Sequence, residues 1–360
     1  MKQQQAISEL DRYARMAIKH SHNQYNKHGT LHEVAKQAFS SSNIWQKPWV
    51  PLDFDIGDPY DHYTYQSFSE EQKLAWNHLQ WGLEYTVVGQ GERQIITLNE
   101  YAVAQYERIV PSVVALEKRE SFEEIDHLAA FQVGLDRLHD RYFPHLSETL
   151  WSMPASGFRS NTRNQKVRAL LGQLGNHLLG SNFPTLFFLT RGLKTHNFKP
   201  FENAIAQFSD GPAGVCRISH LHRLDESRHM ATALNIAHLS NTILDTVNWE
   251  SKQLFKVAVH SAWPKNRPIE YRQAYWKTVL EQATIFSDIP PRDKQALFAH
   301  ISKNIQQNLQ RLHDRQTTLT RQANKKIVEM CGLSPQLKQC FVETLREDPI
   351  YSNLVDAVQL

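Results

Sequence analysis

Apolar residues recur every three to four positions along most of this chain, which is the pattern of amphipathic helices. The first such stretch places Ile7, Leu10, Ala14 and Ile18 on one face. The segment that follows, SSSNIWQKPWVPLDFDIGDPYD, is rich in Pro, Asp and Trp, which favours an irregular path. We therefore expect residues 1–66 to form a helical and irregular segment that wraps around the rest of the protein.

Longer helices are predicted from Ser67 onward. Ser67 or Ser69 is a suitable N-cap, because acidic residues follow it in SFSEEQ. The pattern then runs to about residue 110, where Pro111 interrupts it, and resumes over about 113–141, 183–208 and 215–247. Three further helices are expected at 268–285, 291–328 and 335–346. Strand signals are nearly absent, so the sequence predicts an all-α fold. We expect a four-helix bundle over 67–250 and a C-terminal helical extension over 251–360 packed on it.

Composition narrows the function classes. The 360 residues are 41% hydrophobic and 21% charged, as in ordinary soluble proteins. The chain has no run of 18 apolar residues and its first residues lack an apolar signal region, so we expect a cytoplasmic protein without a membrane span. A net charge of +3 gives no reason to expect nucleic acid as a partner. Its three cysteines, Cys216, Cys331 and Cys340, form no C-x-x-C pair, which argues against thiolate metal sites.

The clearest candidate chemistry lies in the segment HLHRLDESRH. His222, Glu226 and His229 are spaced by four and three residues, so they share one helical face. Apolar residues continue that face, which points it into the bundle, and two imidazoles with a carboxylate suit a transition metal. The other charged residues of the segment are expected to lie off this face: Arg223, Asp225 and Arg228.

A second motif lies about one hundred residues earlier. Glu124 and His127 form an E-x-x-H pair on another inward-facing helix. Di-metal carboxylate bundles combine two such pairs with one carboxylate from each of the other two helices. Counting back about 32 residues from Glu124, the length of two half-helices and a turn, gives Glu92 as the first-helix ligand. Glu100 is the competing candidate.

The third helix breaks this pattern. The corresponding window before Glu226 contains no carboxylate, and His196 is the residue there that could bind a metal. Glu202 is the nearest acid, but it lies beyond Pro200. Proline would kink the helix, and a kink could aim either side chain inward. Both therefore stay open as the third-helix ligand.

This constellation resembles the ferritin-like diiron carboxylate superfamily. The added His222 resembles the p-aminobenzoate N-oxygenase family, whose members carry an extra histidine ligand in a helix similar to HRLDESRH. The resemblance spans about residues 49–244 and departs from the family pattern at the missing third-helix glutamate. It implies a ferritin-like bundle and two iron ions, with manganese as an alternative at one site. The implied ligands are Glu92, Glu124, His127, His222, Glu226 and His229, and we add His196 as the third-helix candidate from its spacing.

The function implied is a non-haem diiron oxygenase. Such an enzyme would use O₂, an electron donor and a small-molecule substrate, with N-oxygenation of an amine as the family reaction. A homodimer is compatible with the sequence. Other di-metal oxidases on the same bundle, such as a desaturase, a hydroxylase or a Mn/Fe oxidase, are the first alternative. A non-enzymatic binding or scaffold protein, whose acid–histidine helices carry surface ion pairs, is the second.

Overall fold

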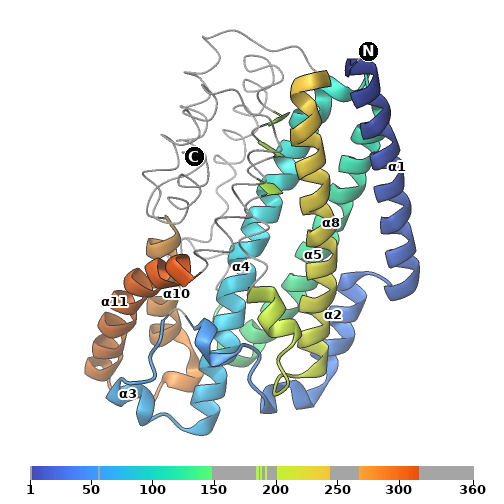
Figure 1. The fold of residues 1–360 in the computed structure, drawn as a ribbon. Coiled ribbons are helices and arrows are strands. Elements are labelled where there is room, and N and C mark those ends of the chain that lie inside the picture. The colour runs from blue at the N-terminus through green and yellow to red at the C-terminus, as the bar shows by residue number, and fades with distance from the viewer. Residues whose placement is uncertain are drawn as a thin grey trace.

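The computed structural model describes residues 2–55, 57–147, 184–185, 187–188, 191–192, 201–243 and 267–315. Every regular element in these ranges is helical, which confirms the all-α prediction for this part of the chain. Three long helices, α4 (Glu70–Val103), α5 (Pro111–Tyr142) and α8 (Ala213–Ile243), run roughly along one another (Figure 1). They are the elements that carry the predicted site.

Helix α4 begins where the sequence signal placed it. The Ser69 hydroxyl accepts a hydrogen bond from the Gln72 backbone N–H, and the Gln72 side chain accepts one from the Ser69 backbone, which completes a capping box. The helix passes through Gly89 and Gly91 without a break and ends in the short 3₁₀ helix η3 (Ala104–Tyr106). Helix α5 then starts with Pro111 at its first turn, where a missing N–H costs nothing.

Helices α4 and α5 pack closely along their length. Gly134 of α5 makes this approach possible, because a Cβ at this position would lie 2.6 Å from a ring atom of Trp81 and 2.7 Å from one of Phe39. The large aromatic side chains of α4 therefore fit against α5 only where the latter has no side chain.

The N-terminal segment covers α5 and α8. Helix α1 (Lys2–His28) packs against both, and so does α2 (Leu31–Ser40) after a turn at Gly29, whose φ is 77°. Asp126 of α5 accepts hydrogen bonds from the first two backbone N–H groups of α2, at 2.6 Å from Leu31 and 3.3 Å from His32. The irregular stretch predicted next contains two short 3₁₀ helices, η1 (Ser42–Gln46) and η2 (Leu52–Phe54), and the short helix α3 (Tyr63–Gln66) follows it.

The C-terminal part that the structure describes consists of α10 (Arg267–Gln282), η5 (Thr284–Phe286) and α11 (Pro291–Arg315). Residues of α10 and α11 share one hydrophobic core with α4 and with the N-terminal segment; Trp276 of α10 stacks on Trp76 of α4 at 3.8 Å between ring centroids. Among the described residues, none of the helices combines the length and the apolar character that a membrane crossing requires. The helix predicted over 335–346 lies outside the described residues.

Candidate metal centre

Three helices direct glutamate and histidine side chains into the interior of the bundle. Helix α4 contributes Glu92, α5 contributes Glu124 and His127, and α8 contributes the residues of the H-x-x-x-E-x-x-H motif. All are buried, with exposed fractions from 0 to 9%. These charged residues are therefore not surface ion pairs.

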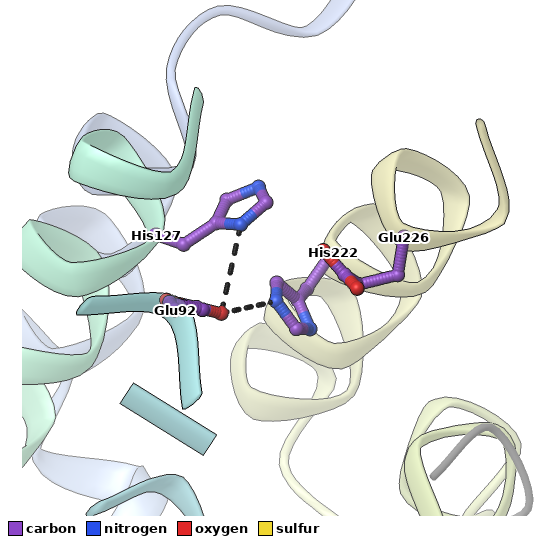
Figure 2. A group of neighbouring side chains, drawn as sticks. All are labelled: Glu92, His127, His222 and Glu226. Atoms are coloured by element: carbon purple, nitrogen blue, oxygen red, sulfur yellow. Dashed lines mark hydrogen bonds and ion pairs between the residues drawn. The ribbon is translucent and has the colours of Figure 1, made fainter. Parts of the chain in front are cut away.

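One group of ligand atoms lies between the three helices. Single donor atoms of Glu92, His127, His222 and Glu226 all lie within 4.8 Å of one another. Figure 2 shows Glu92 between the two imidazoles, with its Oε1 2.9 Å from His222 Nε2 and 3.7 Å from His127 Nδ1. Two imidazole nitrogens and two carboxylates at this spacing could hold a metal ion.

A second group shares one member with the first. Donor atoms of Glu124, Glu226 and His229 also lie within 4.8 Å of one another. His229 Nδ1 is 2.9 Å from Glu226 Oε1 and 3.2 Å from Glu124 Oε1, whereas Glu124 Oε2 lies 3.3 Å from His127 Nδ1. Glu226 belongs to both groups, and the two oxygens of Glu124 face different histidines, so either carboxylate could bridge two ions.

Each E-x-x-H histidine is held from behind by a carboxylate of the opposite helix. His229 of α8 donates from Nε2 to Glu123 of α5 at 2.9 Å, and His127 of α5 donates from Nε2 to Asp225 of α8 at 3.4 Å. Arg228 pairs with both acids, at 2.8 Å and 3.0 Å. The Nε2 atoms thus face outer carboxylates, while the Nδ1 atoms face the inner carboxylates.

This arrangement corrects one sequence expectation. Asp225 and Arg228 do not lie clear of the histidine face, because Asp225 is three residues after His222 and therefore borders the same stripe. Their side chains reach His127 and Glu123 on α5. Arg223 lies nearer the surface, where its guanidinium is 3.4 Å from His220.

The alternatives for the other two helices are also placed. Glu92 is buried, whereas Glu100 is exposed at the solvent side of α4. Glu202, in a helical turn over residues 201–206, is buried and contacts His222 Nδ1 directly. The structure therefore brings Glu202 into the cluster, while His196 lies outside the described residues.

A second layer of buried charge, which the sequence analysis missed, adjoins the cluster. Arg191 lies 3.0 Å from both Glu117 and Glu120 and 3.1 Å from Glu124. The sequence contains a pattern that could have revealed this layer: the acids at positions 117, 120 and 124. Their spacings of three and four place them on the same helical face as His127. Nothing in the local sequence marked Arg191 as their partner.

Carboxylates outnumber the cationic groups paired with them in this part of the described structure. Three arginines, Arg119, Arg191 and Arg228, and the three cluster histidines face eight acids, so the acids outnumber the cationic groups even when every histidine is protonated. Buried charge is costly unless it is compensated, and bound cations would compensate it. The acids are Glu92, Glu117, Glu120, Glu123, Glu124, Glu202, Asp225 and Glu226.

The titration of these groups reflects the crowding. Burial opposes protonation of His222, but Glu202 and then Glu92 outweigh it and raise its pKa to about 10. Burial also opposes ionisation of Glu124, but His229 and His127 hold its pKa well below its usual range. Burial, together with the neighbouring Glu120, raises the pKa of Glu117 to about 8. Metal ions would replace the protons that these histidines otherwise hold.

No model of a known protein family matches this chain, and a search among curated protein sequences finds no similar protein either. The resemblance to diiron N-oxygenases therefore depends on the motif residues and on the geometry that they form.

Proposed function

We propose that this protein is a non-haem diiron oxygenase that uses O₂ to oxidise a small metabolite. The observation that carries the proposal is the orientation of the two E-x-x-H histidines. Each turns Nδ1 toward the inner carboxylates and donates Nε2–H to an acid on the opposite helix. A carboxylate behind a histidine fixes the ring and its tautomer and makes the other nitrogen a better metal ligand.

The donor set fits two metal ions. Glu92, His127, His222 and Glu226 would hold one ion, and Glu124, Glu226 and His229 the other. Glu92 Oε2 is buried and has no hydrogen-bond partner, which is the state expected of an oxygen whose partner is a cation. Glu202 contacts Nδ1 of His222, the ring nitrogen that does not face Glu92, so it would hold this histidine from behind.

The mixture of nitrogen and oxygen donors favours iron, with manganese as the alternative at one site. Imidazole suits iron, whereas carboxylate also accepts manganese. The absence of cysteine from both groups removes the soft thiolate that copper(I) and iron–sulfur clusters prefer.

Two ferrous ions would supply the electrons with which O₂ is activated. The protein's own residues position and isolate that chemistry. Glu123 and Asp225 hold the Nε2 protons of His229 and His127, so each ring keeps one tautomer. Arg191 fixes one oxygen of Glu124, and the buried setting excludes bulk water from the ligands.

A small amine is the proposed substrate class, with transfer of one oxygen atom to its nitrogen. The support is the third imidazole, His222, which gives one site more nitrogen than an E-x-x-H pair supplies. His222 is buried and contacts both Glu92 and Glu202, which supports a role as a ligand over that of a surface group. In this respect the cluster is similar to that of the p-aminobenzoate N-oxygenase family.

The reaction can be tested directly. Protein loaded anaerobically with Fe(II) should consume O₂ with a transient change in its visible spectrum, and with p-aminobenzoate as a probe it should yield hydroxylamino or nitro products. His229→Ala should abolish both, because it removes a direct ligand. If the protein consumes O₂ but oxidises only carbon atoms in a panel of probes, its reaction is that of a hydroxylase or a desaturase and not N-oxygenation. Iron-loaded protein that does not react with O₂ would contradict the proposal.

A further inference from the structure

A row of aromatic rings connects the candidate metal centre to the protein surface. Tyr85 lies beside His222, with 6.5 Å between ring centroids, and stacks on Trp81 at 4.4 Å. Trp81 contacts Trp49 at 5.5 Å, and Trp49 contacts Trp45 at 5.1 Å. These separations place successive rings in van der Waals contact.

The two ends of the row differ in exposure. Tyr85, Trp81 and Trp49 are completely buried, whereas Trp45 in η1 is only half-buried. Trp45 also lies under the guanidinium of Arg141, 4.9 Å from the ring centroid, and the Arg141 side chain is 38% exposed. The row thus begins at Tyr85, beside the candidate ligand His222, and ends at Trp45, where an external molecule can reach it.

Helix geometry links the row to the metal ligands. Tyr85 precedes Glu92 by seven residues, or two turns of α4, so the two share a face. Trp81 lies one turn earlier and packs into the space left by Gly134 of α5. The same helix therefore positions a proposed ligand and the first two rings.

The hydrogen bonds of these rings determine what they can exchange. The Trp81 indole N–H is buried without a hydrogen-bond partner, so an oxidised Trp81 has no group to which it could pass its proton. Trp49 donates its indole N–H to the Ile44 carbonyl at 2.8 Å, which is not a base. Tyr85 hydroxyl and Ser219 hydroxyl share a hydrogen bond of 2.6 Å. These rings can pass electrons but hold their protons.

We infer that Tyr85, Trp81, Trp49 and Trp45 form an electron-transfer route between the candidate metal centre and the surface. The inference depends on the proposed function, because an oxidised metal centre is the electron acceptor. Indole is among the most easily oxidised side chains, and electron transfer is fast only over short gaps, so contacting rings favour a sequence of short steps.

The electrons balance over the whole row. Trp81 would give one electron, across Tyr85, to metal ions that O₂ had oxidised. Trp49 would then restore Trp81, and Trp45 would restore Trp49. An external one-electron reductant then restores Trp45. One electron enters for each electron that the centre receives, no bond forms or breaks, and every ring returns to its starting state.

The test uses the full chain loaded anaerobically with Fe(II), with its iron content measured before anything else. Exposure to O₂ without substrate or reductant should leave holes in the row. Two successive holes at Trp45, where water has access, should convert it to hydroxytryptophan, with the oxygen taken from water and two protons released. Peptide mass spectrometry measures this product. Trp76 and Trp276, which stack on each other outside the row, serve as controls within the same sample and should stay at the level of metal-free protein.

Trp81→Phe should interrupt the row, because phenylalanine fills much of the site but is far harder to oxidise. We expect several-fold less modified Trp45 at unchanged iron content. Since Trp81 is buried, its replacement could disturb folding, so Trp45→Phe at the half-buried end is the second variant. It should prolong the tryptophan radical signal in freeze-quench electron paramagnetic resonance.

The outcomes separate the two proposals. Iron that binds and reacts with O₂, combined with equal Trp45 modification in wild type and Trp81→Phe, overturns the electron route and leaves the diiron function standing. An unchanged lifetime of the tryptophan radical in Trp45→Phe would likewise overturn the electron route. Failure to bind iron overturns both.

Discussion

Glu202 is the third-helix candidate that lies beside the cluster. Its carboxylate is buried against His222, although the spacing of residues before Glu226 favoured His196. Sequence reasoning could not choose between the two, because a helix kink at a proline can aim either side chain inward. A carboxylate in contact with a candidate ligand fits the chemistry that the spacing left unfilled.

Glu202→Gln should therefore lower metal occupancy while the helical content stays the same. The amide keeps the shape of the side chain but loses the negative charge beside His222 that would favour a nearby cation. Glu100→Gln on the exposed side of α4 is the matched control and should bind as the wild type does. Normal metal content in Glu202→Gln would show that Glu202 is not needed for metal binding. A parallel His196→Ala variant would then test whether His196 is the third-helix ligand.

The carboxylates of Glu123 and Asp225, which lie behind His229 and His127, give a second prediction about single residues. Asp225→Asn should weaken metal affinity by about 10- to 100-fold, because the neutral amide is a weaker acceptor and can turn its NH₂ group toward His127, so the tautomer is no longer fixed. The measurement is a competition titration with a metal-binding dye. Asp140→Asn, at an exposed position of α5, is the matched control. An affinity equal to that of the wild type would show that Asp225 is not coupled to a metal ligand.

At the scale of elements, the sequence predicted most residues of the buried cluster, because the helical period alone sets which residues share a face. Glu124 with His127, and His222 with Glu226 and His229, were found in this way, and the bundle geometry located Glu92. Contacts between helices were not predictable. The pairing of Arg191 with Glu117 and Glu120 is an example, because residues about seventy positions apart meet only after packing.

Close packing of α4 on α5 gives a prediction about two glycines. Gly134→Ala should destabilise the fold by about 1–3 kcal/mol, because its Cβ would overlap the rings of Trp81 and Phe39. Gly91→Ala should stabilise it by about 0.4–1 kcal/mol, since a Cβ there meets no atom within 4 Å and alanine lowers the entropy of the unfolded chain. Urea unfolding of metal-free protein measures both. Equal effects at the two positions would contradict the packing.

At the scale of the whole molecule, Asp55 connects the N-terminal segment to the bundle. It accepts hydrogen bonds from Trp76 of α4 at 2.8 Å, Tyr60 at 3.1 Å and the Gly57 backbone at 2.9 Å. Burial nevertheless dominates and raises its pKa from 3.8 to about 6. The folded state thus binds the proton more tightly than the unfolded state does.

This shift fixes the sign of a pH effect. The contribution of protonated Asp55 to stability is complete below about pH 4 and is lost as the pH rises through about 6. The loss amounts to about 3 kcal/mol in the free energy of unfolding, at 1.36 kcal/mol per pKa unit. Asp55→Asn cannot titrate, so its stability should vary less between pH 4 and 6. Parallel curves for variant and wild type in urea unfolding would refute the assignment.

Two metal ions per chain, held by the α4, α5 and α8 ligands, are the central claim. The most direct measurement is the metal content after anaerobic Fe(II) loading and removal of unbound metal. We expect about two irons in the wild type, a large loss in His229→Ala and in Glu226→Ala, and a smaller loss in His222→Ala, because Glu92, His127 and Glu226 would still hold the first ion. A wild-type protein without bound iron or manganese, or equal metal content in all three variants, would contradict the account.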